Sequence, residues 1–565
     1  MDTDSLTPVD LSPVEVPPGS WRREATHCPK PLSPLFRSAL PIFSETFRHA
    51  FSELGALFET LEYRDIGGWV YTRLVPPGGV EGAAPPPELL RQRTERAIAA
   101  VRSENFDAYL EEWSHLRSEF AAGVARLRAV DLRSLDDPAL AAHLGEILEF
   151  SIPAFNVHFR LHGINAMMLT DLSLTCRDLL GWDDRQALEL LSGLSEASTE
   201  PATALAGLTA MARGRPAVRR LIESGSADVS SLHDVDPEFA AALTDYHERF
   251  GLRAIRYEVV DPAIEEMPWF TLRLVADQLR SGFDPAARES DAERRREAAQ
   301  RQARDLLAQR TDAERARFER ALRRAARWYG VREEKATMTL SEQFTLLRWV
   351  ALEIGRRLVE STLLDDPEDA FFLEITELGS AIAGRNTATA ADWRDLVRRR
   401  RAEHAWAEAH PGPLFYGPQA DPRAGLDQLP VEVRLVTEAQ LWKIERAGHF
   451  MATPPQPAGN RINGVPASGG TYTGTVRVLL SEADFDKLQP GDVLVCPITS
   501  PAWSVLFPNV AALVADTGGV MAHSAIIARE FHIPAVVATG NATSLLRDGQ
   551  RVTVDGTAGV VEVLG

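Results

Sequence analysis

The spacing of apolar residues changes once along the 565-residue chain, near residue 453. From about residue 88 to residue 445, apolar residues recur three and four positions apart, as in ERAIAAVRSENFDAYLEEW, and strand-like runs are hard to find. Because this period places them on one face of an α-helix, it predicts a large, mainly helical region. Residues 31 to about 60 have the same spacing, and GGWVYTRLVPPGG, near residues 67–79, predicts a short strand.

The sequence after residue 464 predicts a second domain of a different class. Short β-rich runs such as TYTGTVRVLL, GDVLVCPI and PAVVAT alternate with two helical stretches, SEADFDKL and HSAIIAREF, which predicts an α/β domain over residues 465–565. The Pro- and Gly-rich residues 451–464 are interpreted as a flexible linker. The acidic, Pro-rich residues 1–30 are predicted to form a disordered tail. We therefore expect a multidomain α + α/β protein, with residues 31–450 as its mainly helical part.

The composition argues against several classes of protein. The chain has 61 Lys and Arg against 80 Asp and Glu, a formal net charge of −19, which disfavours a general polyanion binder. Its three cysteines, Cys28, Cys176 and Cys496, lie far apart without CxxC spacing, which disfavours a disulfide framework or a Cys-rich zinc site. No apolar run reaches the roughly 18 residues of a membrane span, and the first residues lack a signal-peptide pattern. We expect a cytoplasmic protein that binds neither nucleic acid nor membranes.

The motif that carries chemistry is TGGVMAHSAIIARE, residues 517–530, in which two glycines and a short turn follow a strand and precede a helix. Glycine lets a ligand approach the main chain closely, and a helix N-terminus suits an anion. His523, predicted to open the helix, could attack a phosphorus centre and carry the phosphoryl group, and the helix dipole would keep its ring neutral. The same spacing also fits a histidine that merely starts a helix, so the motif alone leaves both interpretations open.

The sequence TGGVMAHSAIIAREFHIPAVV closely resembles the signature of the PEP-utilising enzyme mobile domain, the swivelling phosphohistidine domain of phosphoenolpyruvate synthases, pyruvate phosphate dikinases and rifampin phosphotransferases. GVPASGGTYTGTVRVL resembles the entry strand of that family, and VTVDGTAGVVEVL resembles its closing hairpin. GDVLVCPITSPAWSVLF resembles its Thr-x-Pro-x-Trp turn, here Thr499, Pro501 and Trp503. The resemblance covers roughly residues 460–565.

This resemblance implies a C-terminal swivelling β/β/α phosphohistidine domain that shuttles a phosphoryl group between two remote sites. It makes His523 the phosphocarrier. Arg529 would either contact the phosphate or form a structural ion pair, and Thr499 would either flank the histidine or cap a helix. The other positions that correspond to the family's motif are Thr517, Gly518, Gly519 and Ser524.

The helical region shows a weaker resemblance to the substrate-binding domain of rifampin phosphotransferases. TLLRWVALEIGRRLVESTLLDDPEDAFFLEITEL resembles their helix–turn–helix passage, and GVREEKATM, with Arg332 and Glu333, resembles their Arg-Glu turn. YHERFGLRAIRYEVVDPAIEE stands where that family has a Gly- and His-rich loop, but this chain has Leu-Arg-Ala there, so substrate details of that loop are not transferred.

The resemblance also implies a phosphoryl donor, for which the sequence offers no site. In complete enzymes of the family an ATP-grasp domain loads the histidine, but no Gly-rich phosphate loop is found here, and Lys30 is the only lysine before residue 335. No barrel follows the histidine domain, so direct use of phosphoenolpyruvate is not expected. A division between two polypeptides, as in phenylphosphate synthase, would supply the ATP-grasp subunit in trans, with ATP and Mg²⁺ acting through that partner. We therefore expect a dikinase-type phosphotransferase component, incomplete without its partner.

The acceptor is expected to be a small molecule with a hydroxyl group, bound by the helical region. His158 and His162, four positions apart on one predicted helix face, could line its pocket and supply a general base, or could be packed or surface histidines. No third ligand accompanies them, so a metal site is not expected. Two other functions stay open, namely a non-catalytic binding protein switched by phosphorylation of His523, and an ATP-coupled condensation or dehydration enzyme of secondary metabolism.

Overall fold

The computed structural model describes residues 14–79, 85–102, 106–225, 227–385, 390–419, 421–446 and 459–564. The chain divides into two compact units, each of which draws on segments far apart in the sequence. Unit 1 comprises residues up to 164, 257–261 and 335–441, and unit 2 comprises residues 165–256, 262–334 and 442–565.

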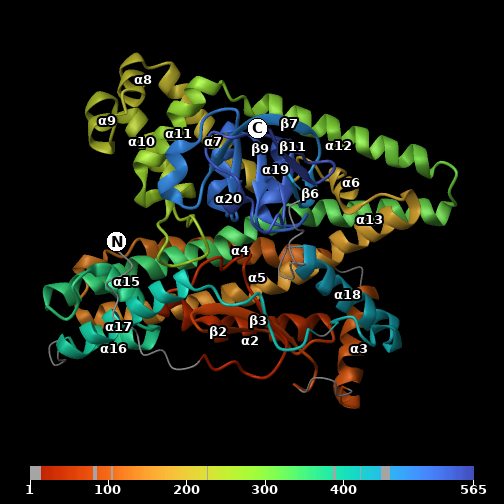
Figure 1. The fold of residues 1–565 in the computed structure, drawn as a ribbon, viewed down its shortest axis with the longest axis horizontal. Helices are drawn as coiled ribbons and strands as arrows, with labels where there is room; N and C mark the ends of the chain where they lie inside the picture. Colours follow the sequence, from red (N-terminus) through yellow and green to blue (C-terminus); the bar gives the residue numbers. More distant parts are fainter. Residues whose placement is uncertain are drawn as a thin grey trace. The chain divides into compact units, whose positions relative to one another are not determined.

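Unit 1 combines a small sheet with long helices (Figure 1). Its sheet has the strand order β2-β3-β1-β4, and all pairs are antiparallel. The strands are β1 (Trp21–Arg23), β2 (Thr60–Ile66), β3 (Trp69–Val75) and β4 (Phe415–Tyr416). The helices are α1 (Pro34–Arg37), α2 (Leu40–Leu54), α3 (Pro87–Arg102), α4 (Phe106–Arg128), α5 (Asp137–Leu180), α15 (Glu342–Glu360), α16 (Ile375–Ala383), α17 (Ala390–Ala409) and α18 (Val431–Arg446). Helices α5 and α18 continue into unit 2, beyond residues 164 and 441 respectively.

Aromatic side chains of α2 form the centre of the unit 1 core. The rings of Phe47 and Phe159 have centroids 4.3 Å apart, and those of Phe43 and Phe155 are 5.3 Å apart. Residues three and four positions apart share one face of a helix, so this spacing turns the phenylalanines of α2 toward α5 together.

Part of the segment predicted to be an N-terminal tail forms a strand. β1 pairs with β3 and β4, and the Trp21 side chain is fully buried, with its Nε1 donating to the Pro17 carbonyl at 2.9 Å. Burial of this large ring stabilises an ordered backbone. The acidic and Pro-rich composition of the segment did not indicate this contact.

The helices of unit 2 form a cluster and a long antiparallel hairpin, α12 and α13 (green in Figure 1). The hairpin turns at Thr311, whose Oγ1 accepts from the Glu314 N–H at 3.2 Å and so caps α13. The helices are α6 (Asp184–Glu189), α7 (Glu196–Arg213), α8 (Pro216–Glu223), α9 (Val229–Val235), α10 (Pro237–Phe250), α11 (Pro268–Ser281), α12 (Pro285–Leu307), α13 (Asp312–Tyr329) and the start of α14 (Val331–Ala336).

The C-terminal part of unit 2 is an eight-stranded sheet with the order β5-β12-β11-β7-β8-β9-β10-β6. The central pairs β7–β8, β8–β9 and β9–β10 are parallel, and the outer pairs are antiparallel. The strands are β5 (Arg461–Asn463), β6 (Val465–Ser468), β7 (Thr471–Val478), β8 (Asp492–Cys496), β9 (Val510–Ala515), β10 (Ala535–Val537), β11 (Arg551–Asp555) and β12 (Val560–Leu564). A 3₁₀ helix, η8 (Pro501–Asn509), and two α-helices, α19 (His523–Phe531) and α20 (Ala542–Leu545), complete it.

The two faces of this sheet belong to different apolar cores. Val495 of β8 and Val514 of β9 lie in a core confined to the sheet domain. Leu494 and Leu513, their neighbours in sequence, lie in a second core that the sheet shares with η8, α19 and the helices α7, α10 and α11. Successive side chains of a strand point to opposite faces, so each strand contributes alternate residues to the two cores.

The fold class predicted from the sequence is confirmed, with a large helical part and a C-terminal sheet domain. The predicted boundaries at residues 31, 450 and 465 stay a prediction. Of the predicted linker 451–464, residues 451–458 lie outside the described residues, and residues 461–463 form β5.

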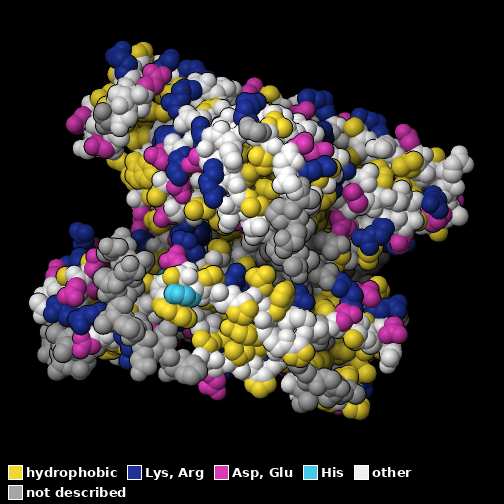
Figure 2. All heavy atoms as spheres, viewed as in Figure 1, with side chains coloured by type: hydrophobic (Ala, Val, Ile, Leu, Met, Phe, Trp, Pro, Cys, Tyr) yellow, Lys and Arg dark blue, Asp and Glu magenta, His cyan; other side chains and the backbone are white. Residues whose placement is uncertain are grey.

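Acidic and basic side chains are interspersed over the face drawn in Figure 2. Several of them pair along helices, such as Arg294 with Asp291 and Arg301 with Glu297, at spacings of three and four residues. Each helix in the described part of the chain is too short or too polar to cross a lipid bilayer.

Gly556 lies where the β11–β12 turn passes close to the backbone of β6 and β10. A Cβ at this position would lie 1.9 Å from the carbonyl oxygen of Ser468 and 2.6 Å from the nitrogen of Ala535. We expect Gly556→Ala to lower the free energy of unfolding by about 1–3 kcal/mol, because the strands must separate to admit the methyl group. The matched control is Gly207→Ala in α7, where a Cβ has no neighbour within 4 Å and alanine should stabilise the helix by up to about 1 kcal/mol. Urea unfolding of both variants measures the difference, and equal midpoints would contradict the expectation.

Candidate active site

The loop between β9 and α19 is held in place on its way to His523. Thr517 donates from its backbone N–H and its Oγ1 to the Pro497 carbonyl at 3.1 and 2.9 Å. Gly518 follows with φ 101°, and a Cβ there would lie 3.1 Å from the Cβ of Ala522, so glycine permits the turn. Ala522 is the N-cap of α19 and gives no side-chain acceptor to the first-turn N–H groups. Helix amides of this kind can donate to an anion.

His523 is the first residue of α19, and its ring is paired with a buried carboxylate. The side chain is 7% exposed, and its Nδ1 lies 2.7 Å from Oε2 of Glu333, which is 5% exposed. Arg332 Nε lies 3.4 Å from the other oxygen of Glu333. A carboxylate at hydrogen-bond distance places the ring proton on Nδ1. Nε2 then carries the lone pair, and among the described residues this buried atom has no hydrogen-bond partner.

Two further predicted site residues bury hydroxyl groups. Oγ of Ser524 and Oγ1 of Thr499 are buried and have no hydrogen-bond partner within the described part of the chain. The hydroxyl that caps η8 belongs instead to Ser500, which accepts from the Ala502 N–H. Buried polar atoms are nearly always hydrogen-bonded, so these two hydroxyls are suited to a bound ligand or water.

Arg529 fastens the loop that precedes His523. Its side chain is buried, and Nη1 donates to the carbonyls of Val520 and Ala467 at 2.8 and 3.1 Å. Gly519 lies in the same loop. Its carbonyl accepts from the Ala522 N–H at 2.9 Å, and this hydrogen bond closes the turn before α19. These contacts are to backbone carbonyls, and they make Arg529 a brace between the loop and β6.

His158 and His162 lie on α5 in unit 1, whereas His523 belongs to unit 2. Their rings are stacked with centroids 5.9 Å apart. His158 is buried, and its Nδ1 lies 2.9 Å from Oγ1 of Thr339, which stands in a π-helical turn (Thr337–Ser341). π-Helical turns are often found at functional sites. The role of the two histidines at an acceptor pocket stays a prediction.

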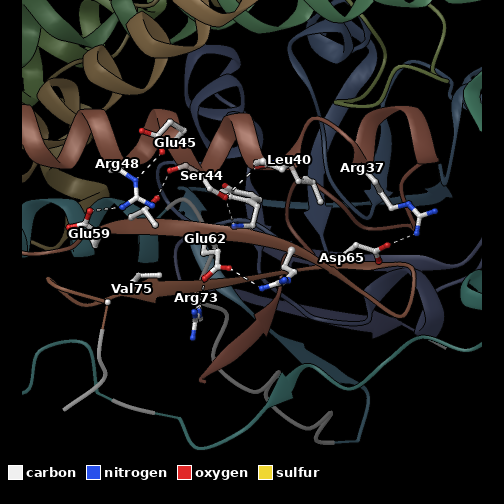
Figure 3. Close-up of a pocket in the computed structure, with 15 residues that line it drawn as sticks. Arg37, Leu40, Ser44, Glu45, Arg48, Glu59, Glu62, Asp65, Arg73 and Val75 are labelled. Carbon is white, nitrogen blue, oxygen red and sulfur yellow. Dashed lines mark hydrogen bonds and ion pairs between the residues drawn. The ribbon is translucent and has the colours of Figure 1, made fainter. Parts of the chain in front are cut away.

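A separate cavity of about 700 Å³ lies in unit 1 between α2 and the β2–β3 hairpin (Figure 3). Its arginines are paired with carboxylates, Arg37 of α1 with Asp65 of β2, and Arg73 with Glu62 between the two strands of the hairpin. None of the residues predicted to form the site lines it. In the described residues no group of three or more His, Cys, Asp or Glu side chains is arranged to hold a metal ion.

Two family models match the chain, and each of them includes one residue of the His523–Glu333 pair. Residues 488–559 match the model of the PEP-utilising enzyme mobile domain, and residues 157–333 match that of the rifampicin phosphotransferase fourth domain. The chain carries both domains. The predicted resemblance to these two families is therefore confirmed. His523 lies in the mobile domain, and Glu333 is the last residue of the fourth-domain match.

Three curated relatives illustrate the range of similar proteins. The uncharacterized phosphotransferase YvkC of Bacillus subtilis is 25% identical over 76% of this chain and 51% of its own length. A rifampicin phosphotransferase of Streptomyces sp is 30% identical over 76% of this chain and 47% of its own length. Chondramide synthase cmdD of Chondromyces crocatus is 30% identical over 96% of this chain and 14% of its own length. The chain thus spans about half, or less, of the length of these relatives.

Glu333 is the residue of the site that the sequence pointed to least. The sequence identifies Glu333 only as part of a turn that resembles rifampin phosphotransferases. It gives no indication that this residue pairs with His523. The two residues are 190 positions apart and belong to different family models, so no local spacing could pair them.

Glu530, on the helix that His523 opens, is a second buried carboxylate. Its Oε2 accepts from the Gly193 N–H at 3.0 Å. Burial raises the pKa of Glu530 to about 8, although Arg529, Gly193, Arg295 and Arg288 act in the opposite direction. In the folded protein the Glu530 carboxyl therefore keeps its proton up to a higher pH than it does in the unfolded chain.

We expect Glu530→Gln to flatten the pH dependence of unit 2 stability. With a pKa near 8 in the folded state and an ordinary value of 4.5 in the unfolded state, the folded protein binds the extra proton between these two pH values. Its free energy of unfolding should therefore fall as the pH rises through this window, by at most about 1.4 kcal/mol per unit. Thermal unfolding from pH 5 to pH 8 measures the slope, with Glu562→Gln, an exposed residue of β12, as the control. An equal slope in wild type and Glu530→Gln would contradict the assignment.

Proposed function

We propose that this chain is the phosphocarrier and acceptor-binding component of a phosphotransferase. The observation that carries the proposal is the pairing of His523 Nδ1 with Glu333, which leaves Nε2 as a buried lone pair at a helix N-terminus. The two family matches and the relatives named phosphotransferases support the same function.

In the loading step, the lone pair of Nε2 attacks a phosphoryl group of ATP. The N–P bond forms, the P–O bond to the nucleotide breaks, and its electron pair leaves with the nucleotide. Nδ1 keeps its proton, and the ring acquires a positive charge that the hydrogen bond to Glu333 stabilises once the mobile domain is docked on the helices. The Thr499 and Ser524 hydroxyls and the first-turn amides of α19 donate to the phosphoryl oxygens.

In the transfer step, the hydroxyl oxygen of a small-molecule acceptor attacks phosphorus. The N–P bond breaks, and its electron pair returns to Nε2. The hydroxyl proton passes to a base, for which His158 and His162 of the helical region are the candidates.

The phosphoryl donor is proposed to be an ATP-grasp partner that acts in trans. About half of each phosphotransferase relative lies outside its match to this chain, which leaves room there for a donor-binding domain. ATP would bind to the partner with Mg²⁺, which bridges phosphate oxygens during phosphoryl transfer.

A second candidate function rests on the match to chondramide synthase, which covers nearly the whole chain. In this function, phosphoryl activation through His523 would precede an ATP-coupled condensation or dehydration step in biosynthesis. The products distinguish the two functions. An acceptor that retains the phosphate indicates a phosphotransferase, and a condensed or dehydrated product with free phosphate indicates the second function.

The first test is radiolabelling of the chain with ATP, with and without candidate ATP-grasp partners. We expect acid-labile label that requires the partner and is lost in His523→Ala, because phosphorus on a ring nitrogen is released by acid. His532→Asn, at the other end of α19, is the matched control and should keep the label; asparagine tolerates the left-handed backbone there (φ 49°). Label that survives in His523→Ala would refute the proposal.

The second test addresses Glu333. We expect Glu333→Ala to slow transfer of the label from phosphorylated His523 to candidate acceptors by about 10²-fold or more, because in the docked form Nδ1 loses the acceptor that fixes its proton. Glu333→Gln should be intermediate, since its amide oxygen can still accept from Nδ1 but carries no charge. Rapid-quench measurement of the acid-labile label gives the rates, and wild-type rates in Glu333→Ala would contradict this role.

A further inference from the structure

Two side chains of the mobile domain donate to one backbone carbonyl of the helical part of unit 2. Oγ of Ser500 and Nε1 of Trp503 lie 2.6 and 3.0 Å from the carbonyl oxygen of Ile255. All three residues are buried. Ile255 is itself held in place, because its N–H donates to the Pro262 carbonyl at 3.1 Å. A carbonyl oxygen has two lone pairs, so the mobile domain supplies a donor for each. Ser500, Trp503 and the Ile255 carbonyl are called the Ile255 clamp below.

The clamp lies within an apolar face that the mobile domain shares with the helices. Phe485 of the sheet domain connects the two parts, with its ring centroid 4.8 Å from that of Trp503 and 4.9 Å from that of Phe270 on α11. Phe507 of η8 lies in the same core. The contact between the sheet domain and the helices is mainly apolar, and apolar contacts alone have little directionality. The two hydrogen bonds of the clamp therefore fix the relative position of the two surfaces.

The far end of α19 is held by a separate contact. Nη1 of Arg288 on α12 donates to the Phe531 carbonyl at 2.7 Å, and its guanidinium lies 3.9 Å from the centre of the Phe531 ring. The helix that begins at His523 is thus fixed to the helical part of unit 2 near its C-terminus, while η8 is fixed by the clamp.

These contacts leave His523 inaccessible from outside the protein. Nε2 is buried, and the ring as a whole is 7% exposed. A donor on another protein reaches Nε2 only after the mobile domain separates from the helices. The conformation described here is therefore closed to loading from outside.

We propose that Ser500 and Trp503 are positioning residues, whose clamp on the Ile255 carbonyl holds His523 against Glu333 and whose opening exposes Nε2 for loading. This inference rests on the proposed function, because it assigns the two residues a part in the same carrier cycle. Neither residue touches the reacting atoms in the steps described above.

The test uses diethyl pyrocarbonate, which acylates the free ring nitrogen of neutral histidine, with peptide mass spectrometry to resolve individual sites. Ser500→Ala/Trp503→Phe removes both donors and keeps an aromatic ring at the interface. The variant removes two buried hydrogen bonds of ordinary strength, so we expect labelling of His523 to become about thirtyfold faster. His49, whose side chain is 64% exposed, is the internal reference and should react at an unchanged rate. Trp503→Phe alone is the milder variant if the double variant folds poorly, and it should give a smaller increase.

Val514→Ala is the matched control for general destabilisation. This residue is fully buried, but it lies in the core on the other face of the sheet, away from the helices. We expect it to lower the unfolding midpoint without exposing His523. Unchanged labelling of His523 in the clamp variants, or an equal increase in Val514→Ala, would overturn the proposal.

A second readout connects the clamp to loading. With ATP and the partner that phosphorylates His523, the clamp variants should gain acid-labile label faster than wild type, whereas structural damage would slow it. Slower or unchanged loading would overturn the role of the clamp in loading. If wild type gains no label with any partner, the proposed function fails, and the acylation experiment still decides whether the clamp controls access to His523.

Discussion

The hydrogen bond between His523 Nδ1 and Glu333 Oε2 is the interaction on which the rest of unit 2 depends. It joins the first residue of α19 to a carboxylate 190 positions earlier in the chain. A buried carboxylate costs free energy unless it is paired, and here the ring N–H and Arg332, 3.4 Å away, pair it. This hydrogen bond forms only when the mobile domain packs against the helices in one relative position, which we call the register. The Ile255 clamp fixes this register between the two parts, and Arg529 fixes the loop before His523 within the sheet domain.

The two faces of the sheet suit the docking and movement that we propose for the mobile domain. One face of the sheet is covered within its own domain, by a core that includes Val495 and Val514. The other face carries η8 and α19 and shares its core with α7, α10 and α11. Separation from the helices would expose the shared core and leave the other core intact. The sheet domain therefore has a core of its own, which the carrier role proposed above would require.

Sequence reasoning succeeded where chemistry is encoded locally. The Gly-Gly turn and the helix that starts at His523 are neighbours in the chain, so their spacing predicted the loop and helix that the structure contains. It failed where partners are distant. Neither Glu333 nor the carbonyl of Ile255 has a local pattern, because a backbone acceptor carries no side-chain signal and a single glutamate is common. The division into two units was also hidden, since residues 257–261 group with unit 1 although both flanking segments group with unit 2.

In the carrier cycle proposed above, burial of Nε2 would have opposite consequences for loading and for transfer. Exclusion of water protects a phosphorylated ring from hydrolysis and strengthens the hydrogen bonds that hold it. The same burial prevents a second protein from reaching the nitrogen.

The balance between the closed and open forms depends on two kinds of contact, which differ in the free energy needed to break them. The hydrogen bonds of the Ile255 clamp can be exchanged for hydrogen bonds to water at a net cost of about 1 kcal/mol each. The apolar face around Trp503 and Phe531 is exposed at about 25 cal/mol for each Å². Both kinds of contact oppose opening, and the clamp, which is directional, favours a closed form that brings His523 to Glu333 rather than to another part of the helices.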